Sequence, residues 1–265
     1  MWGTDSTSSS WRVPNYFSTG RMSKLQIKAA IFDMDGTLID TESLYTEVTN
    51  ELLGERGLGP LTWDVKVQLQ GLPGKHAAQK LLDNYPKMDM TAEEWMEKAH
   101  TIQQTKWTKC QWLPGAKQVI EELARLNIPI AVATSSLRHN YDLKTLHLRD
   151  GFDLFGEHIV CGDDPEIPHG RGKPHPDIYH VALGSLNKGR TVPIKPEECL
   201  VFEDAVPGLE SANRFGAAQV VFLPDPNIVG LYTEQEFKQV VGDNLHLQTL
   251  ASFNVNDYDF ITTDS

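Results

Sequence analysis

Short apolar runs alternate with amphipathic stretches through most of this chain. Each run is four to six residues long and rich in Ile, Val, Ala or Phe, a composition typical of strands that are buried on both faces of a sheet. The predicted strands cover residues 27–32, 128–133, 158–161, 199–202 and 219–223. The predicted helices cover residues 114–126, 137–147 and 207–215, with one more from residue 176 onward. This alternation predicts an α/β fold with a doubly wound, Rossmann-like parallel sheet.

Residues 41–111 interrupt the alternation with a pattern that is helical throughout. Apolar residues recur at every fourth position from Leu44 to Leu52, which places them on one face of a helix. Near the end of this region, Thr91 is followed three residues later by Glu94, the capping-box signature of a helix start. The predicted helices cover residues 41–54, 63–69, 75–85 and 91–107.

The two patterns divide the chain into a core and an insertion. We expect residues 25–40 and 112–265 to form the core, and residues 41–111 to form a small all-helical domain inserted in it. We expect residues 1–24 to form a disordered tail, because the first 21 residues hold five Ser and only one acidic residue. A weak mitochondrial presequence is the alternative interpretation of this tail.

The net charge of −12 at pH 7 limits the partners that this protein can bind. Nucleic-acid binding needs a basic surface, so we expect no nucleic-acid partner. No apolar run approaches the roughly 20 residues that span a bilayer, so we expect no membrane partner. The three cysteines are widely spaced and form neither a zinc-site nor a disulfide pattern, which is typical of reduced thiols. We therefore expect a cytoplasmic protein, and we expect it to be a monomer.

Polar residues follow several predicted strands at their carboxyl ends, where open parallel sheets bind ligands. These residues are Asp33 and Asp35, Thr134 and Ser135, and Glu203 and Asp204, with Lys173 in a loop that precedes a helix. Four carboxylates this close together raise one another's pKa and need a cation. Mg2+ fits, because it prefers oxygen ligands and often keeps waters for a substrate. Such a site suits phosphoryl transfer, in which one carboxylate attacks phosphorus, another moves a proton, and hydroxyls with an ammonium bind the phosphate.

Four segments resemble, in order along the chain, the motifs of the haloacid dehalogenase superfamily. Residues 33–37, Asp-Met-Asp-Gly-Thr, resemble its first motif, and Thr134 ends its strand as the hydroxyl of the second motif does. Residues 172–177, which include the lysine, resemble the third motif, and residues 202–208, Phe-Glu-Asp-Ala-Val-Pro-Gly, resemble the fourth. The resemblance covers about residues 27–225. It implies a Mg2+-dependent phosphatase with the core fold of this superfamily and a type-1 helical cap over residues 41–111.

The resemblance also implies a role for each aspartate of the first motif. Asp33 would be the nucleophile, forming an aspartyl-phosphate, and a metal ligand. Asp35 would donate a proton to the leaving group and then act as the base that activates water. The backbone carbonyl of Asp35 would also reach the metal.

The other motif residues would bind the phosphate or the metal. Thr134, Ser135 and Lys173 would hold the transferred phosphoryl group. Asp204 would bind Mg2+, and Glu203 would bind it directly or through a water molecule. The partner implied is a small phosphorylated metabolite.

Two further segments resemble a narrower branch of the superfamily. Residues 162–166, Gly-Asp-Asp-Pro-Glu, and residues 200–205, Leu-Val-Phe-Glu-Asp-Ala, resemble the eukaryotic branch that contains pseudouridine 5′-phosphatase and its fungal relatives. This resemblance implies a nucleoside or sugar monophosphate as substrate, with pseudouridine 5′-phosphate as one candidate.

Two other functions stay open. A phosphosugar mutase like β-phosphoglucomutase shares the four motifs and the cap type, but it needs a basic residue in the cap loop to hold a second phosphate. Here the loop reads Gly-Leu-Pro-Gly from Gly71 to Gly74, with Lys75 next, which favours hydrolysis; we expect Gly71 and Lys75 to contact the substrate. The second alternative is a non-catalytic binding protein on the same fold, but every residue type that the chemistry needs is present.

Overall fold

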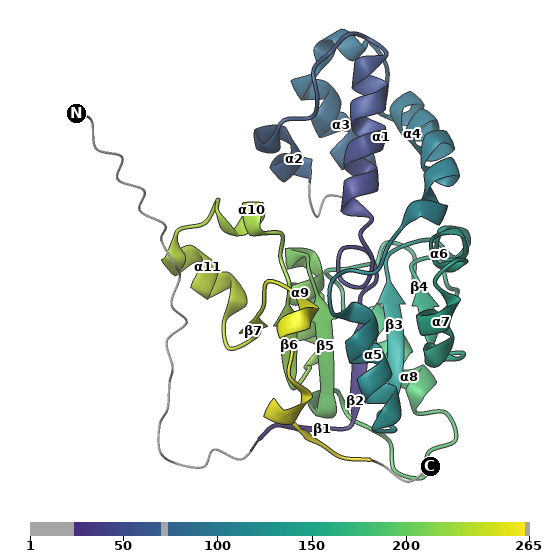
Figure 1. The fold of residues 1–265 in the computed structure, drawn as a ribbon, viewed down its shortest axis with the longest axis vertical. Helices are drawn as coiled ribbons and strands as arrows, with labels where there is room; N and C mark the ends of the chain where they lie inside the picture. Colours follow the sequence, from purple (N-terminus) through teal and green to yellow (C-terminus); the bar gives the residue numbers. More distant parts are fainter. Residues whose placement is uncertain (1–23, 70–73, 263–265) are drawn as a thin grey trace, which may run out of the picture.

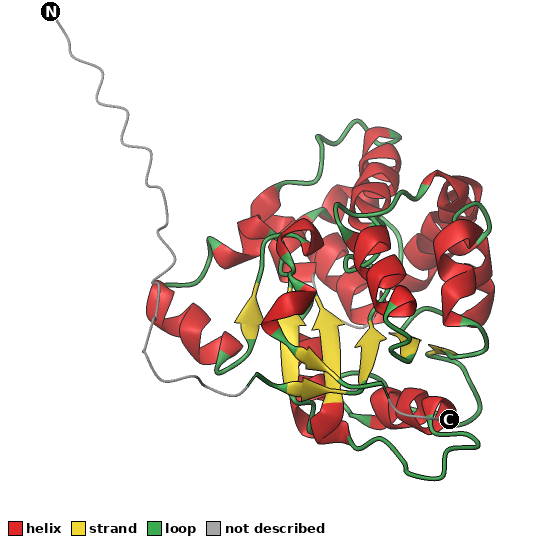
Figure 2. Ribbon diagram, turned by 60° about the horizontal axis from the view of Figure 1, so that its bottom comes forward, coloured by secondary structure: helices red, strands yellow, loops and turns green. Residues whose placement is uncertain are grey.

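A six-stranded sheet forms the centre of the computed structural model, which describes residues 24–69 and 74–262 (Figures 1 and 2). Every neighbouring pair of strands is parallel, and the strand order is β4-β3-β2-β5-β6-β7. The strands are β2 (Ala29–Phe32), β3 (Ile130–Thr134), β4 (Ile159–Cys161), β5 (Cys199–Glu203), β6 (Gln219–Phe222) and β7 (Leu245–His246). The predicted α/β fold with a doubly wound parallel sheet is therefore confirmed.

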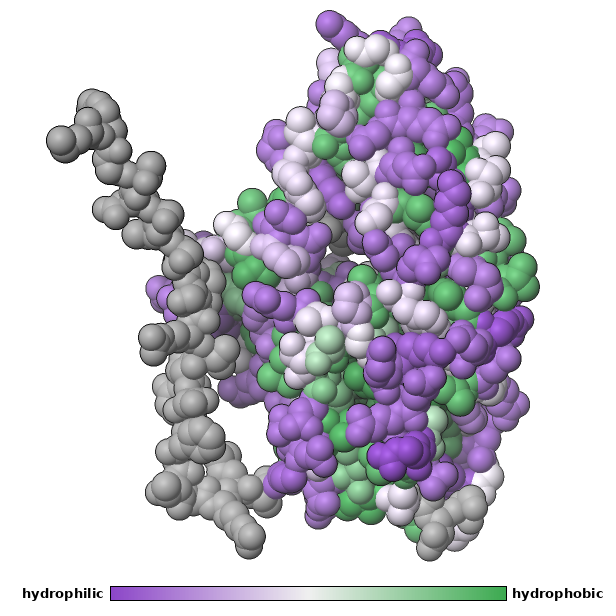
Figure 3. Space-filling view, in the orientation of Figure 1, coloured by the Kyte–Doolittle hydropathy of each residue, from purple (hydrophilic) through white to green (hydrophobic). Residues whose placement is uncertain are grey.

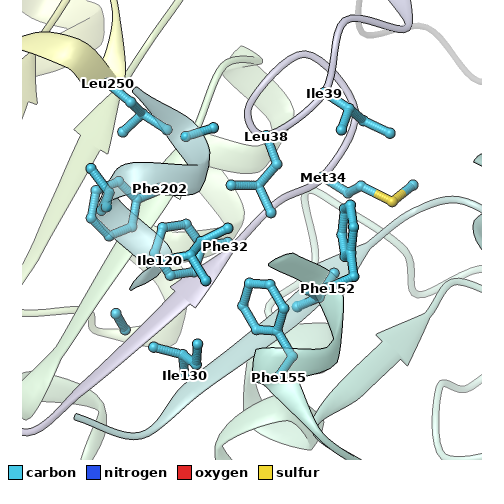
Figure 4. Close-up of a cluster of buried hydrophobic side chains, with 14 of the residues drawn as sticks. Phe32, Met34, Leu38, Ile39, Ile120, Ile130, Phe152, Phe155, Phe202 and Leu250 are labelled. Carbon is cyan, nitrogen blue, oxygen red and sulfur yellow. The ribbon is translucent and has the colours of Figure 1, made fainter. Parts of the chain in front are cut away.

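Helices cover both faces of the sheet, which is why its central strands are apolar at almost every position. One face packs against α5 (Ala116–Arg125), α6 (Arg138–Thr145) and α7 (Arg149–Phe152). The other packs against α8 (Asp177–Leu186), α9 (Val206–Phe215) and α11 (Glu234–Val241), and α10 (Pro226–Val229) precedes α11. On the first face, Phe32 stacks on Phe202 of the neighbouring strand, with ring centroids 4.3 Å apart, and Ile120 of α5 lies in the same cluster (Figure 4).

A lobe of four helices lies between β2 and α5 in the chain and stands over the carboxyl ends of the strands (Figure 1). Its helices are α1 (Glu42–Gly54), α2 (Trp63–Leu69), α3 (Gly74–Asn84) and α4 (Ala92–Lys106). They share a hydrophobic cluster of their own, which includes Leu52, Leu81 and Trp95. The capping box at the start of α4 is confirmed, because the Glu94 N–H donates to the Thr91 hydroxyl and the Thr91 N–H donates to the Glu94 carboxylate. The surface is hollowed where this lobe meets the core (Figure 3).

The prediction of one continuous strand over residues 27–32 is wrong. The structure divides it into β1 (Gln26–Ile27), which pairs with β8 (Asp259–Phe260) in a separate two-stranded sheet, and β2 in the main sheet. The chain bends between them at Lys28, whose N–H donates to the Glu198 carbonyl and whose ammonium pairs with the Glu198 carboxylate at 2.5 Å. An apolar run does not reveal such a bend, because the apolar residues on both sides of it are buried in either case.

The sequence pattern predicts no helix or strand after residue 223, yet this part of the chain contains α10, α11, β7 and β8. Three of these elements are two to four residues long, too short for hydrophobic periodicity to identify, and α11 has eight residues but only Val241 of it is buried. Within residues 24–69 and 74–262, no helix has the length and apolar character needed to cross a bilayer.

Candidate active site

The candidate site lies where β2, β3 and β5 end, beneath the helical lobe. Phe32 of β2 pairs in register with Phe202 of β5 and with Val132 of β3, so the residues that follow these three strands arrive at one edge of the sheet. Met34 is fully buried in the hydrophobic core (Figure 4). Its burial fixes the loop and lets the aspartates on both sides of it face the site.

Lys173 joins all three of these strand ends through three hydrogen bonds. Its ammonium lies 2.6 Å from Asp33 Oδ1 and 2.5 Å from Glu203 Oε1, and it also donates to the carbonyl of Ala133 at 3.0 Å. Burial opposes a charged lysine, but the two carboxylates outweigh it and raise the pKa of Lys173 above its usual range. The site therefore contains a permanent positive charge although the whole protein carries −12.

Glu203 holds the Lys173 ammonium in place by accepting its hydrogen bond. Its Oε1 accepts a second hydrogen bond from the Tyr179 hydroxyl at 2.6 Å, and its Oε2 accepts one from the Asp204 N–H at 3.1 Å. Gly208 of α9 passes directly beside it, and a Cβ at that position would lie 1.9 Å from Oε1. The glycine of the fourth motif thus leaves room for this carboxylate.

The carboxylates of Asp33, Glu203 and Asp204 can each place an oxygen within 4.8 Å of the others. Burial, together with repulsion from Glu203 and Asp35, raises the pKa of Asp33 to about 7 despite the opposing effect of Lys173. Burial and repulsion from Asp33 and Glu203 likewise raise the pKa of Asp204 well above its usual range. These shifts mark a deficit of positive charge, and three carboxylate donors of this kind fit a hard divalent cation.

The loop of the first motif holds Asp204 in this group. The Thr37 hydroxyl donates to Asp204 Oδ1 at 3.2 Å. Gly36 has a φ of +83°, and a Cβ there would lie 2.3 Å from Asp204 Oδ2. Both the backbone conformation and the space therefore favour glycine in this loop.

Asp35 lies in a different environment from Asp33. Its Oδ1 accepts a hydrogen bond from the Lys144 ammonium at 2.5 Å, and its Oδ2 accepts from the Ser136 hydroxyl at 2.7 Å and from the Thr134 hydroxyl at 3.2 Å. Burial acts to raise the pKa of this carboxyl, but the charge and hydrogen bond of Lys144, with the Ser136 hydroxyl, outweigh it and lower the pKa below its usual range. Two aspartates that are two residues apart thus have opposite pKa shifts.

Most of the predicted site residues lie together: Asp33, Asp35, Thr134, Lys173, Glu203 and Asp204. Ser135 is exposed, and it is the next residue, Ser136, whose hydroxyl contacts Asp35. Lys75 is exposed in the helical lobe and pairs with Glu93 at 2.6 Å, so its contact with substrate stays a prediction. Gly71 lies outside the described residues.

Three residues that contact the site carboxylates escaped the sequence analysis: Ser136, Lys144 and Tyr179. Lys144 and Tyr179 lie in predicted helices, and Ser136 lies just before one, so none of the three directly follows a predicted strand. For Lys144 a signal exists, because it lies three residues after Tyr141 and four before Leu148, both of which are buried. A lysine at this spacing lies on the inner face of its helix, where it needs a partner.

Comparisons with known proteins agree with this geometry. Residues 27–216 match the family model of the haloacid dehalogenase-like hydrolases. The chain is 46% identical over 232 residues to the probable pseudouridine-5′-phosphatase of Saccharomyces cerevisiae, covering 88% of this chain and 97% of that protein. It is 36% identical over 203 residues to (DL)-glycerol-3-phosphatase 2 of Arabidopsis thaliana, covering 76% and 81% of the two chains.

A solved structure gives the same result for the fold. The structure of a haloacid dehalogenase family hydrolase from Deinococcus radiodurans, with bound phosphate and sodium, superposes with a TM-score of 0.67 at 27% identity, covering 85% of this chain and 92% of that one. The predicted resemblance is confirmed, and the relatives group this chain with phosphatases. The chain belongs to the haloacid dehalogenase-like hydrolase family.

Proposed function

We propose that this protein is a Mg2+-dependent phosphatase that hydrolyses a nucleoside or sugar monophosphate through an aspartyl-phosphate on Asp33. The observation that carries the proposal is the contact of Lys173 with Asp33 at 2.6 Å within the three-carboxylate group of Asp33, Glu203 and Asp204. A nucleophile, a cation that can bind a phosphoryl oxygen, and a set of donors for a divalent metal are thereby combined in one small site.

Asp33 and Asp204 would hold Mg2+ through their carboxylates, with the backbone carbonyl of Asp35 and with Glu203, directly or through water. The bound ion supplies positive charge that keeps Asp33 ionised and attracts the phosphate. Both oxygens of Glu203 already accept hydrogen bonds, from Lys173 and Tyr179 on one side and from a backbone N–H on the other. This favours the water-mediated role for Glu203, with the direct support of Lys173 as its main task.

In the first half-reaction Asp33 attacks phosphorus and the bond to the leaving oxygen of the substrate breaks. Asp35 donates the proton that the leaving oxygen needs. Lys173 is already beside Asp33 Oδ1, so it stabilises the negative charge of the phosphoryl group as it is transferred. Thr134 at the end of β3 donates its one hydroxyl proton to Asp35 Oδ2, and it would have to turn from Asp35 to donate to a phosphoryl oxygen instead.

In the second half-reaction water attacks the phosphorus of the aspartyl-phosphate. Asp35 takes the proton from the water, and the bond between phosphorus and Asp33 breaks to release phosphate. Asp35 thus ends the cycle in the protonation state in which it began. The helical lobe stands over this site and would exclude bulk water while the first step proceeds.

For the substrate we favour pseudouridine 5′-phosphate. The supporting observation is the 46% identity to the yeast protein of that name over 97% of its length. The Arabidopsis relative, at 36% identity, is a glycerol-3-phosphatase, so a smaller alkyl phosphate is the alternative that the experiment must separate.

The test is phosphate release with Mg2+ from a panel of monophosphates. The panel contains pseudouridine 5′-phosphate, uridine 5′-phosphate, ribose 5-phosphate, glycerol 3-phosphate and β-glucose 1-phosphate, and kcat/KM is compared across it. Asp33→Asn is the control, because an amide cannot form the acyl phosphate and should abolish turnover. Equal phosphate release by Asp33→Asn and the wild type would refute the proposed function, and dependence on a sugar bisphosphate activator would point to the mutase instead.

A further inference from the structure

Lys144 is a buried lysine to which the chemistry above gives no task. It lies in α6, and its side chain is fully shielded from solvent. An ammonium ion loses its hydration when it moves from water to a protein interior, and this is strongly unfavourable unless a partner compensates for it. The partner is Asp35, whose Oδ1 lies 2.5 Å from the Lys144 ammonium.

A second contact closes a ring of three side chains around the Asp35 carboxylate. The Lys144 ammonium also donates to the Ser136 hydroxyl at 2.9 Å, and that hydroxyl donates in turn to Asp35 Oδ2 at 2.7 Å. Lys144 therefore holds Oδ1, Ser136 holds Oδ2, and the hydrogen bond between Lys144 and Ser136 links the two contacts. Rotation of the carboxylate would break at least one of these hydrogen bonds, so the ring fixes the direction in which Asp35 faces.

Two aromatic side chains cover the ammonium from the side of the helical lobe. The Lys144 ammonium lies 4.5 Å from the centre of the Trp107 ring, and it donates to the Tyr45 hydroxyl at 3.4 Å. Tyr45 belongs to the first turn of α1, and Trp107 directly follows α4, so the two rings mark the places where the chain enters and leaves the lobe. Rings in these positions attract the cation and shield its ion pair from water, which strengthens the pair.

The hydrogen bonds to the Asp35 carboxylate leave room for one further donor. A carboxylate has about four acceptor positions. In the described structure Oδ2 accepts from Ser136 and Thr134, and Oδ1 accepts from Lys144. One acceptor position on Oδ1 is left, and the buried hydroxyl of Thr41 and an incoming water molecule are the two donors that compete for it.

We propose that Lys144 is a positioning residue that holds Asp35 as an oriented carboxylate for the hydrolysis of the aspartyl-phosphate. This inference rests on the proposed function. In that step the water oxygen bonds to phosphorus, the bond from phosphorus to Asp33 breaks, and one water proton passes to the acceptor position of Asp35. Lys144 touches neither the phosphate nor the water; it acts through Asp35.

The test uses p-nitrophenyl phosphate with saturating Mg2+, because its leaving group departs without a proton. For this substrate kcat/KM reports the transfer to Asp33, whereas hydrolysis of the phosphoenzyme contributes only to kcat. For Lys144→Gln we expect kcat to fall on the order of 10- to 100-fold while kcat/KM stays within about threefold, since positioned acid–base groups contribute roughly 10² to 10⁴. A burst of p-nitrophenolate approaching one equivalent per enzyme should accompany this change, because the phosphoenzyme accumulates.

The matched control is Lys80→Gln, which makes the same change at an exposed position in α3. It should behave as the wild type. A simple loss of structure at Lys144 would lower kcat/KM and kcat together without a burst, and that result, or unchanged kinetics, would overturn the inference. Turnover by the wild type but not by Asp33→Asn shows separately that the proposed function holds.

Ser136→Ala provides a second variant if Lys144→Gln does not fold, as judged by circular dichroism. Ser136 is half-buried and completes the ring around Asp35, so its loss disturbs the fold less. We expect the same separation of kcat from kcat/KM and the same burst, with a smaller loss. Equal reduction of both constants without a burst in Ser136→Ala would likewise overturn the inference.

Discussion

Replacement of Gly208 by alanine adds one methyl group where the structure leaves no room for it. The Cβ would lie 1.9 Å from Oε1, 2.0 Å from Cδ and 2.2 Å from Oε2 of Glu203. Glu203 cannot simply turn away, because hydrogen bonds from Lys173, Tyr179 and the backbone N–H of Asp204 hold its carboxylate. The substitution therefore tests whether Glu203 positions Lys173.

The magnitude follows from two opposed contributions. Alanine in a helix is favoured over glycine by roughly 0.5–1 kcal/mol. Overpacking a dense interior costs typically about 1–3 kcal/mol, and breaking a buried ion pair costs more. After subtraction of the helix gain, we expect Gly208→Ala to lower the free energy of unfolding by about 0.5–2.5 kcal/mol, which corresponds to a Tm roughly 1–10 °C lower for a chain of this size.

The effect on activity should exceed the effect on stability. A displacement of about 1 Å at a group that binds the transferred phosphoryl can reduce the rate about 100-fold. The added methyl group would displace Glu203, and Glu203 holds Lys173 through a hydrogen bond. We therefore expect kcat/KM of Gly208→Ala to fall by about 10- to 100-fold at a temperature well below its Tm. Thermal melts followed by circular dichroism, and steady-state kinetics at 20 °C below the lower Tm, measure the two effects independently.

Gly184→Ala is the matched control. Gly184 also lies in a ten-residue helix, α8, but it is exposed and a Cβ there would meet no atom within 4 Å. This variant should keep the wild-type kcat/KM and a Tm at or slightly above that of the wild type. If Gly208→Ala behaved as Gly184→Ala does, the crowding around Glu203 and its support of Lys173 would both be refuted.

Two further predictions concern the aspartates. Burial raises the pKa of Asp33 to about 7 in the metal-free protein, so Mg2+ must displace a proton from Asp33 below pH 7. The apparent affinity for Mg2+, measured from the shift in Tm on titration with the ion, should therefore rise from pH 6 to pH 8. An affinity that stayed constant or fell over this range would contradict this explanation. Asp35→Asn, which removes the acid and base but leaves the metal ligands, should lower kcat by roughly 10² to 10⁴ with a normal circular dichroism spectrum, and a loss below tenfold would exclude the acid–base role.

The part of the site that could be predicted from the sequence is the part that follows from the topology of the sheet. Asp33 and Glu203 lie at the ends of neighbouring parallel strands, and residues in such positions meet whatever the details of packing are. The third motif predicts a site role for Lys173, whose ammonium lies between these two carboxylates. Short buried strands and the capping box at Thr91 were predictable for the same reason, because local composition determines them.

Contacts that depend on how a helix packs could not be predicted in this way. The spacing of Lys144 from buried Tyr141 and Leu148 indicates an inward-facing lysine, but it does not say which carboxylate Lys144 meets, because that depends on where α6 packs against the sheet. The strand β8 pairs with β1 across more than 200 residues, and two-residue strands carry no periodic signal. In both cases the information lies in the tertiary packing, which spacing along the chain does not report.

The two aspartates of the first motif differ in their share of positive charge, and this difference separates their roles. Asp33 shares Lys173 with Glu203 and lies beside Asp204, so one ammonium faces three carboxylates and the pKa of Asp33 rises to about 7. Asp35 pairs with Lys144, and its pKa falls. Asp33 therefore becomes fully ionised at neutral pH only when further positive charge arrives, whereas Asp35 is a carboxylate without it. The lowered pKa suits Asp35 as the base of the proposed second step, whereas the proposed first step needs the same carboxyl to be protonated before it can give a proton to the leaving oxygen.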